Sequence, residues 1–357
     1  MDEKTCPSWG SSLKANCIKQ VDNCVPKGYI QGMRWIAAAL LTLTPALGLA
    51  GQTFLQKPIT VAVIDSGFGY KGLGHNAKLC KYGHKDFSIA QVYDSRFNTS
   101  DPIPLDVSGH GTNVAGLIED YAKDANFCLV IIKYVNHYKK DDTNTALMKA
   151  LKYADEIKVD IINYSGASIG YIPEEVTLIK KFIDSGGIFI TSAGNDKSEL
   201  NGKTKYKIYP AMDDDRIIVV GSKNPFPVKN LFASGGELEE HGWKVENRMP
   251  DIQEKLDKNG FCVLEIEEEA KDVIQVDDMN IPVPYKYTYY RVLIKHDDKV
   301  FLKSDFSNWG QRVNRWEIGD MQTSYGITFS GTSQATAIAT GKLVGQLYEK
   351  LNKLSER

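Results

Sequence analysis

The stretch Phe329-Ser-Gly-Thr-Ser-Gln-Ala-Thr-Ala-Ile-Ala-Thr-Gly341 decides how the rest of the chain is interpreted. A glycine and small residues surround Ser333, at a point where a loop is predicted to turn into a helix. The Ser333 hydroxyl would then lie at the positive end of the helix dipole, with little bulk around it. A serine hydroxyl is unreactive at neutral pH unless a base takes its proton and a third group orients that base. The stretch therefore predicts a nucleophile, and it requires a histidine and a carboxylate elsewhere in the chain.

Both groups occur in glycine-containing motifs. Asp65 ends the apolar run Val61-Ala-Val-Ile-Asp65-Ser-Gly67, and His110 opens a helical pattern in Asp106-Val-Ser-Gly-His110-Gly-Thr-Asn-Val-Ala-Gly116. Taken singly, each motif is more typical of a turn, a loop or a helix cap. The chain order of Asp65, His110 and Ser333 is the order found in subtilisin, and it differs from that of chymotrypsin-like enzymes and α/β-hydrolases. The conjunction of the three motifs in this order favours the catalytic interpretation.

The chain resembles the subtilisin-like serine peptidases (subtilases) at Asp65-Ser-Gly, His110-Gly-Thr, Gly331-Thr-Ser333 and Ser192-Ala-Gly-Asn195. The resemblance extends over roughly Pro58 to Leu351, with one long interruption. It implies a serine endopeptidase that cleaves peptide bonds through an acyl-enzyme intermediate, with His110 as the base for Ser333 and Asp65 orienting the imidazole. It also implies that the Asn195 amide belongs to the oxyanion hole. The chain departs from the family at Asn113, where a second histidine is common, and at Gln334 and Ala337, where methionine and proline are common.

The resemblance further implies that a polypeptide substrate binds in an extended conformation. Asn163-Tyr-Ser-Gly-Ala167 resembles the backbone segment that pairs with substrate in the family. The predicted substrate-binding residues are Ser165, Gly166, Ala167, Ala193 and Gly194. The chemistry needs no cofactor and no metal ligand is predicted, although family members often carry structural calcium, whose ligands the sequence does not place. The net charge of −2, with dispersed basic residues, argues against a nucleic-acid partner.

Apolar runs alternate with helical stretches from Pro58 onward, which is typical of a doubly wound, mostly parallel sheet with helices on both faces. The chain is therefore placed in the α/β class, and the resemblance to subtilases implies a subtilisin-like fold. The predicted strands are Ile59–Ile64, Leu129–Tyr134, Ile161–Tyr164, Ile188–Thr191 and Arg216–Val220, and the predicted helices are Thr143–Glu156 and Glu174–Ser185. In such sheets ligands gather at the carboxyl ends of the strands, so Asp65, Ser165 and Asn195 are expected to converge along one edge.

A small β-rich insertion at residues 228–303 is predicted to interrupt the peptidase domain, which spans residues 58–352. Glu265-Ile-Glu-Glu-Glu269 has a helical composition, whereas Tyr285–Lys295 is strand-like and His296–Lys299 is typical of a hairpin turn. The role and the partner of the insertion stay open between substrate gating, docking of another protein and no function.

The N-terminal residues suggest export. Residues 33–50 contain the uncharged apolar run 35–50, which is too short for a comfortable membrane span and ends in small residues of the kind that a signal peptidase reads. We expect a signal peptide and a secreted or periplasmic protein. The alternatives are a membrane anchor through 35–50 and a core helix, and the core helix is disfavoured because the run has no polar face. Residues 1–32 form an uncertain leader, which a true start at Met33 would remove.

Export would leave three cysteines in an oxidising compartment. Cys80 lies in Ala77-Lys-Leu-Cys-Lys-Tyr82, and Cys128 opens Cys128-Leu-Val-Ile-Ile-Lys133, a neighbouring strand in a subtilase sheet. A Cys80–Cys128 disulfide is one hypothesis, and two buried free thiols are the other.

Two other function classes compete with the peptidase. One is a catalytically silent binding protein on a subtilase fold, with its cleft covered by the insertion. The other is an esterase, because Gly166-Ala-Ser168-Ile-Gly170 matches the Gly-x-Ser-x-Gly elbow after a strand. The elbow should turn directly into a helix, whereas Tyr171-Ile-Pro173 separates it from the predicted one, so the esterase is disfavoured.

Overall fold

The structure, a computed structural model, describes residues 57–122, 124–135, 143–200, 208–225, 256–257, 259–276, 279–297 and 299–355. These residues divide into two compact units, one within Lys223–Asp305 and the other formed by residues 57–222 and 306–355. The predicted leader 1–32 and the apolar segment 33–50 lie outside the described residues. Within the described ranges, no helix combines the length and the hydrophobicity that a bilayer span requires.

The larger unit is built on a seven-stranded sheet with the order β14-β10-β8-β6-β1-β5-β2. Neighbouring strands from β10 to β2 are parallel. The bounds are β1 Ile59–Asp65, β2 Lys85–Asp86, β5 Phe127–Lys133, β6 Ile161–Tyr164, β8 Ile188–Ser192, β10 Ile218–Lys223 and β14 Arg315–Ile318. The central strands are nearly continuous apolar runs, as expected for strands that are covered on both faces. The α/β class and all five predicted strands are confirmed.

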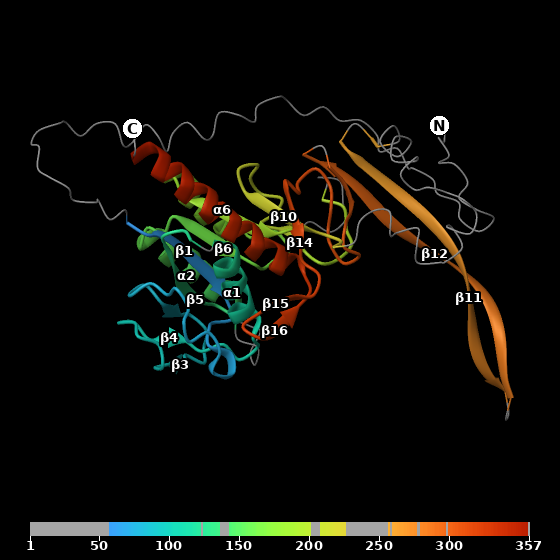
Figure 1. The fold of residues 1–357 in the computed structure, drawn as a ribbon, viewed down its shortest axis with the longest axis horizontal. Helices are drawn as coiled ribbons and strands as arrows, with labels where there is room; N and C mark the ends of the chain where they lie inside the picture. Colours follow the sequence, from blue (N-terminus) through green and yellow to red (C-terminus); the bar gives the residue numbers. More distant parts are fainter. Residues whose placement is uncertain are drawn as a thin grey trace, which may run out of the picture. The chain divides into compact units, whose positions relative to one another are not determined.

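Two pairs of helices pack on the sheet (Figure 1). α1 (His110–Ala122) packs against α6 (Thr332–Ser355), and α2 (Thr143–Glu156) packs against α3 (Pro173–Asp184). α1 and α6 approach closely at Gly341, where an added Cβ would lie only 2.5 Å from the carbonyl oxygen of Ile118. A larger residue at Gly341 would therefore push apart the two helices that carry His110 and Ser333. The two predicted helices are confirmed, and correspond to α2 and α3.

Short elements complete the larger unit in the described residues. The 3-10 turn η2 is Tyr70–Gly72, and the antiparallel pairs are β3 (Tyr93–Asp94) with β4 (Ile103–Pro104), β7 (Ser168–Ile169) with β9 (Ile208–Tyr209), and β15 (Gln322–Ser324) with β16 (Ile327–Phe329). Ser168 thus lies in a strand, and α3 begins only at Pro173. This backbone is not a strand–turn–helix elbow, so the esterase interpretation is wrong.

The smaller unit contains a long antiparallel ribbon. Its strands are β11 (Phe261–Val276), β12 (Met279–His296) and β13 (Lys299–Leu302). The predicted hairpin turn is confirmed, since His296 pairs with Lys299 and Asp297 has a φ of 49°. The helical interpretation of Glu265–Glu269 was wrong because these residues pair with Lys286–Tyr290 of β12, and the ladder overrides the helix propensity of glutamate.

The Cys80–Cys128 disulfide is present and joins the segment before β2 to β5. The two Cα atoms lie 4.8 Å apart, and the Cys80 backbone N–H donates to the carbonyl of Leu129. The hypothesis of a bridge between these segments is confirmed.

Candidate active site

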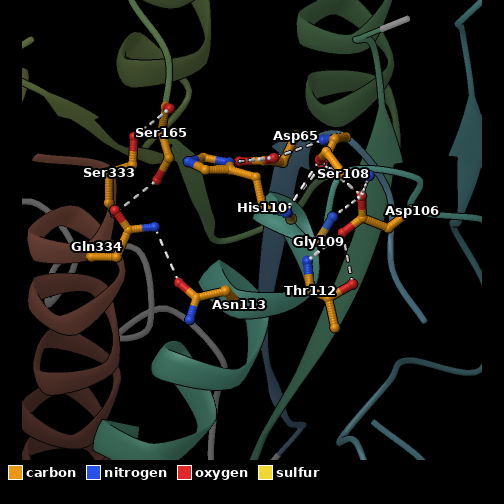
Figure 2. A network of polar contacts seen from close by, with 12 residues as sticks. Asp65, Asp106, Ser108, Gly109, His110, Thr112, Asn113, Ser165, Ser333 and Gln334 are labelled. Atoms are coloured by element: carbon orange, nitrogen blue, oxygen red, sulfur yellow. Dashed lines mark hydrogen bonds and ion pairs between the residues drawn. The ribbon is translucent and has the colours of Figure 1, made fainter. Parts of the chain in front are cut away.

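The predicted carboxylate and histidine meet at the carboxyl end of β1. Asp65 is the last residue of this strand, and His110 is the first residue of α1. The Nδ1 atom of His110 lies 2.8 Å from Oδ1 of Asp65, an oxygen that also accepts the Ser66 N–H at 2.7 Å. The Asp65 side chain is 5% exposed and the His110 side chain 28% exposed, so the imidazole reaches solvent while its partner is buried. Figure 2 shows the imidazole ring lying between Asp65 and Ser333.

The electrostatic surroundings of His110 favour its protonated form. Burial by itself lowers the pKa of the imidazole, but the charge and hydrogen bond of Asp65 and the charge of Asp106 outweigh it, so the pKa is raised above its ordinary value. A histidine in this environment can take a proton more readily than a free imidazole.

Asp106 holds the first turn of α1, a role that the sequence interpretation missed. Its carboxylate accepts the backbone N–H groups of Ser108 (2.9 Å), Gly109 (3.0 Å) and Thr112 (2.9 Å). It also accepts the hydroxyls of Ser66 at 3.0 Å and Thr112 at 2.7 Å (Figure 2). These contacts satisfy N–H groups that have no partner within the helix, and they tie the start of α1 to the residue after Asp65. An aspartate four residues before a histidine that opens a helix is the capping signal that could have found it.

An aromatic side chain packs against the His110 ring and restricts its orientation. Phe329 of β16 meets it edge to face, with the ring centroids 5.7 Å apart. Gly111 lies so close to the turn after β1 that an added Cβ would be 2.3 Å from the Gly67 carbonyl oxygen. The glycine that follows His110 is therefore required for the helix to approach Asp65.

Ser333 is the second residue of α6 and is 8% exposed. Its Oγ donates to the Ser165 carbonyl at 3.0 Å, and the Ser165 Oγ donates to the Ser333 carbonyl at 3.1 Å. Asn163 supports this reciprocal pair, because its Nδ2 donates to the Ser165 Oγ and its Oδ1 accepts the hydroxyl of Thr340 in α6. The Ser333 hydroxyl proton thus points to Ser165, and proton transfer to His110 requires a rotation of the Ser333 side chain.

Asn195 follows β8 and faces the start of α6. Its Oδ1 accepts the backbone N–H and the hydroxyl of Thr332, both at 2.9 Å. The backbone N–H of Thr332 can only donate, so the amide atom that it contacts must be the oxygen. The Asn195 Nδ2 then lies on the side of Gly331, where an added Cβ would be 3.4 Å from it. A donor is therefore available beside Ser333.

The predicted substrate-binding residues lie on two adjacent backbone segments. Ser165, Gly166 and Ala167 follow β6, and the Gly166 carbonyl accepts the hydroxyl of Ser192 at 3.2 Å. Ala193 and Gly194 follow β8, and the Gly194 N–H donates to the Thr332 hydroxyl at 3.2 Å. The structure thus brings both segments to the start of α6.

A buried amide pair links the helices that carry His110 and Ser333. The Gln334 Nε2 donates to the Asn113 Oδ1 at 3.1 Å (Figure 2). The Asn113 Nδ2 donates to the carbonyls of Ile327 at 2.8 Å and Gln322 at 3.2 Å. These residues stood out in the sequence only as departures from the family pattern. Together they join α1, α6 and the β15–β16 hairpin that presents Phe329.

A sequence model of the Subtilase family matches residues 56–357. The chain belongs to the subtilase family. This subtilase is 28% identical over 179 residues to the Major intracellular serine protease of Bacillus subtilis (strain 168), which covers 46% of this chain and 51% of that protein. It is 28% identical over 213 residues to Subtilisin-like protease 2 of Plasmodium falciparum, covering 56% of this chain and 15% of that protein. The chain thus spans about half the length of the first relative and a smaller part of the second.

The solved structures that resemble this subtilase are more distant in sequence. A cold adapted subtilisin-like serine proteinase is 19% identical with a TM-score of 0.46, and the match covers 81% of this chain and 75% of that chain. A lanthipeptide protease is 16% identical with a TM-score of 0.48, covering 83% and 74%.

Proposed function

We propose that this subtilase is a serine endopeptidase that uses Asp65, His110 and Ser333 as its triad. The observation that carries the proposal is the 2.8 Å contact between the His110 Nδ1 and the buried Asp65 carboxylate, on the side of the imidazole that faces away from Ser333. This contact leaves Nε2 to accept the serine proton. Buried Asp–His pairs beside a serine at a helix N-terminus suit acyl transfer.

In the proposed reaction the Ser333 hydroxyl leaves the Ser165 carbonyl and its proton passes to Nε2 of His110 as Oγ attacks the peptide carbonyl carbon. The oxyanion that forms accepts hydrogen bonds from the Asn195 Nδ2 and the Ser333 backbone N–H. His110 then gives its proton to the amine nitrogen as the peptide C–N bond breaks, which leaves Ser333 acylated. In the second half His110 takes a proton from a water whose oxygen attacks the acyl carbon, and it returns that proton to the Ser333 Oγ as the ester bond breaks and the acid product leaves. Asp65 orients the imidazole and stabilises the imidazolium that forms.

The substrate in this proposal is an extended polypeptide. The segments Ser165–Ala167 and Ala193–Gly194 would pair with its backbone, because small residues let another chain approach closely. Catalysis needs no cofactor in the proposal, and structural calcium stays a prediction without assigned ligands. The part of the chain that the structure describes contains no group of three or more His, Cys, Asp or Glu side chains placed to hold a metal ion.

Export to an oxidising compartment is part of the proposal. It is supported by the apolar segment 33–50 and by the Cys80–Cys128 disulfide, a bond that is rare where thiols are kept reduced. One relative is named as an intracellular protease, so location needs its own test. Cell fractionation with N-terminal sequencing should find the chain outside the cytoplasm and cleaved near Gly51. Recovery of uncleaved chain from the cytoplasm would contradict export, and uncleaved chain in the membrane would favour an anchor through 35–50.

Labelling of the full chain with a fluorophosphonate tests the nucleophile. We expect the wild type to be labelled, Ser333→Ala to be unlabelled and Ser330→Ala to be labelled, since Ser330 lies three residues away and holds only the Met321 N–H. Label that persists in Ser333→Ala would contradict the assignment. A folded wild type that neither labels nor cleaves a peptide library would favour the silent binding protein instead.

A further inference from the structure

The loop that carries Asn195 is held by one side chain from a distant part of the sequence. Asn308 is fully buried, and its Oδ1 accepts the N–H groups of Asp196 at 3.0 Å and Ser198 at 2.8 Å. Its Nδ2 donates to the Ala193 carbonyl at 2.8 Å, and its backbone N–H donates to the Gly194 carbonyl at 2.9 Å. A fifth and longer bond, of 3.4 Å, runs from the Asn308 Nδ2 to the Asp196 Oδ2, and all five fall on either side of Asn195 without touching it.

Asn308 lies against Gly194 so closely that no side chain would fit between them. Gly194 has a φ of +95°, and an added Cβ there would lie 2.5 Å from the Asn308 Nδ2. Asn195 and Asp196 are exposed, so the surrounding core does not hold this part of the loop. The bonds to Asn308 therefore restrain the backbone on both sides of Asn195, together with the contacts that Thr332 makes to Gly194 and to the Asn195 side chain.

Asn308 is itself fixed from both sides. Lys197 donates its N–H to the Phe306 carbonyl at 3.1 Å, and Trp309 donates its N–H to the Ser198 carbonyl at 3.0 Å. The Ser307 hydroxyl oxygen accepts the N–H of Ser222 at the end of the sheet strand β10 at 2.9 Å. The segment that contains Asn308 is thus anchored to the sheet, which makes it a rigid support for the loop.

We propose that Asn308 is a positioning residue for the oxyanion donor Asn195, and this proposal rests on the proposed function above. An oxyanion donor is effective only when it is already placed where negative charge develops in the transition state. Without the Asn308 side chain, the backbone on both sides of Asn195 loses bonds that support it, while the Thr332 contacts to the Asn195 Oδ1 remain. The loss should appear mainly in the transition state, with a smaller effect on substrate binding through Ala193 and Gly194.

The test is a double-mutant cycle on the full chain, with peptide hydrolysis measured well below the melting temperature of each variant. Asn308→Ala should lower kcat about 10- to 100-fold and change KM by a smaller factor, because the oxyanion interaction is made mainly in the transition state, whereas Ala193 and Gly194 also contact bound substrate in the proposal. In an Asn195→Ala background the same substitution should lower kcat by less than about threefold, because the donor that Asn308 positions is already absent.

Asn314 offers a control away from the Asn195 loop, since it also bridges two backbone groups, accepting the Val219 N–H and donating to the Ile217 carbonyl, both at 2.9 Å, although it is exposed whereas Asn308 is buried. Asn314→Ala should lower stability and leave kcat unchanged. If Asn308→Ala does not fold, Asn308→Asp serves instead, because it keeps both accepted bonds, loses the donations to the Ala193 carbonyl and the Asp196 carboxylate, and places a second carboxylate beside Asp196.

The positioning role would be overturned if Asn308→Ala lowered kcat by the same factor in the wild type and in the Asn195→Ala background. It would also be overturned if Asn314→Ala lowered kcat as much as Asn308→Ala does. If Asn195→Ala alone leaves kcat unchanged in an enzyme that a fluorophosphonate labels at Ser333, the oxyanion assignment fails and the positioning role fails with it. If Asn195→Ala lowers kcat and Asn308→Ala acts additively, only the positioning role fails.

Discussion

Glu175 gives this subtilase a buried carboxyl group whose ionisation should weaken the fold. It lies in the first turn of α3, is fully buried, and neither carboxylate oxygen has a hydrogen-bond partner among the described residues. Burial, and then the charge of Asp213, raise its pKa from 4.5 to about 7. The pKa of Asp213 is raised to about 6, mainly by its own burial. We predict that Glu175→Met stabilises the protein at alkaline pH.

The sign follows from linkage. A carboxyl group whose pKa is higher in the folded state binds its proton more tightly there, so stability is retained below pH 4.5 and lost as the pH rises towards 7. A pKa raised from 4.5 to about 7 lowers the free energy of unfolding by about 3 kcal/mol at pH 8 and by about 1 kcal/mol at pH 5. A carboxylate at a helix N-terminus recovers about 0.3–1 kcal/mol. Glu175→Met should therefore gain about 2 kcal/mol more at pH 8 than at pH 5.

Urea unfolding at pH 5 and pH 8 measures this difference, in a Ser333→Ala background that prevents self-digestion. Methionine matches glutamate in length and helix propensity, so the substitution mainly removes the charge. Glu174→Met is the matched control, because Glu174 lies in the same turn but is exposed, so the substitution removes a carboxyl group without relieving the burial of one. A stability change from Glu175→Met that is equal at the two pH values would refute the reasoning.

Three further predictions concern the site and its support. Asp65→Asn should lower kcat by about 10⁴-fold and move the acid limb of the kcat/KM profile to lower pH, because Asp65 raises the pKa of the paired histidine; an unmoved limb would contradict this. Replacing Cys80 and Cys128 together with alanine should cost about 4 kcal/mol of unfolding free energy in urea, given their sequence separation of 48, and an unchanged midpoint would argue that the bridge does not form. Asn113→Ala and Gln334→Ala should show a coupling energy of about 0.5–3 kcal/mol in a stability cycle, whereas additive effects would mean that their hydrogen bond is not made.

The sequence predicted what local periodicity and local motifs can encode. β1 is a β-branched apolar run that ends in Asp65, and α2 repeats apolar residues at helical spacing, so both were found with nearly the observed bounds. The disulfide was also foreseeable, because Cys80 and Cys128 lie in neighbouring segments of the predicted sheet.

What the sequence did not reveal depends on contacts between distant residues. Asn308 lies more than 100 residues from the loop that it holds, and no local pattern distinguishes it from an ordinary turn asparagine. Glu265–Glu269 has a composition that suits a helix, and only pairing with β12 makes it a strand. The hydrogen bond between Ser333 and the Ser165 carbonyl likewise joins residues brought together by the sheet and α6.

The chain enters and leaves the smaller unit at two segments that lie side by side. The segment that follows β10 pairs with the end of β13. The backbones of Lys223 and Lys303 form an antiparallel β-bridge, and the Asn224 N–H donates to the Leu302 carbonyl at 2.7 Å. Because the ends of the insertion are adjacent, its length adds only a slowly growing entropy cost to folding of the larger unit. The anchor at Ser222 and the support from Asn308 both lie outside the insertion, on the larger unit. Changes in the short return segment 306–309 should act directly on the loop that carries Asn195, because Asn308 bonds to the backbone on both sides of it.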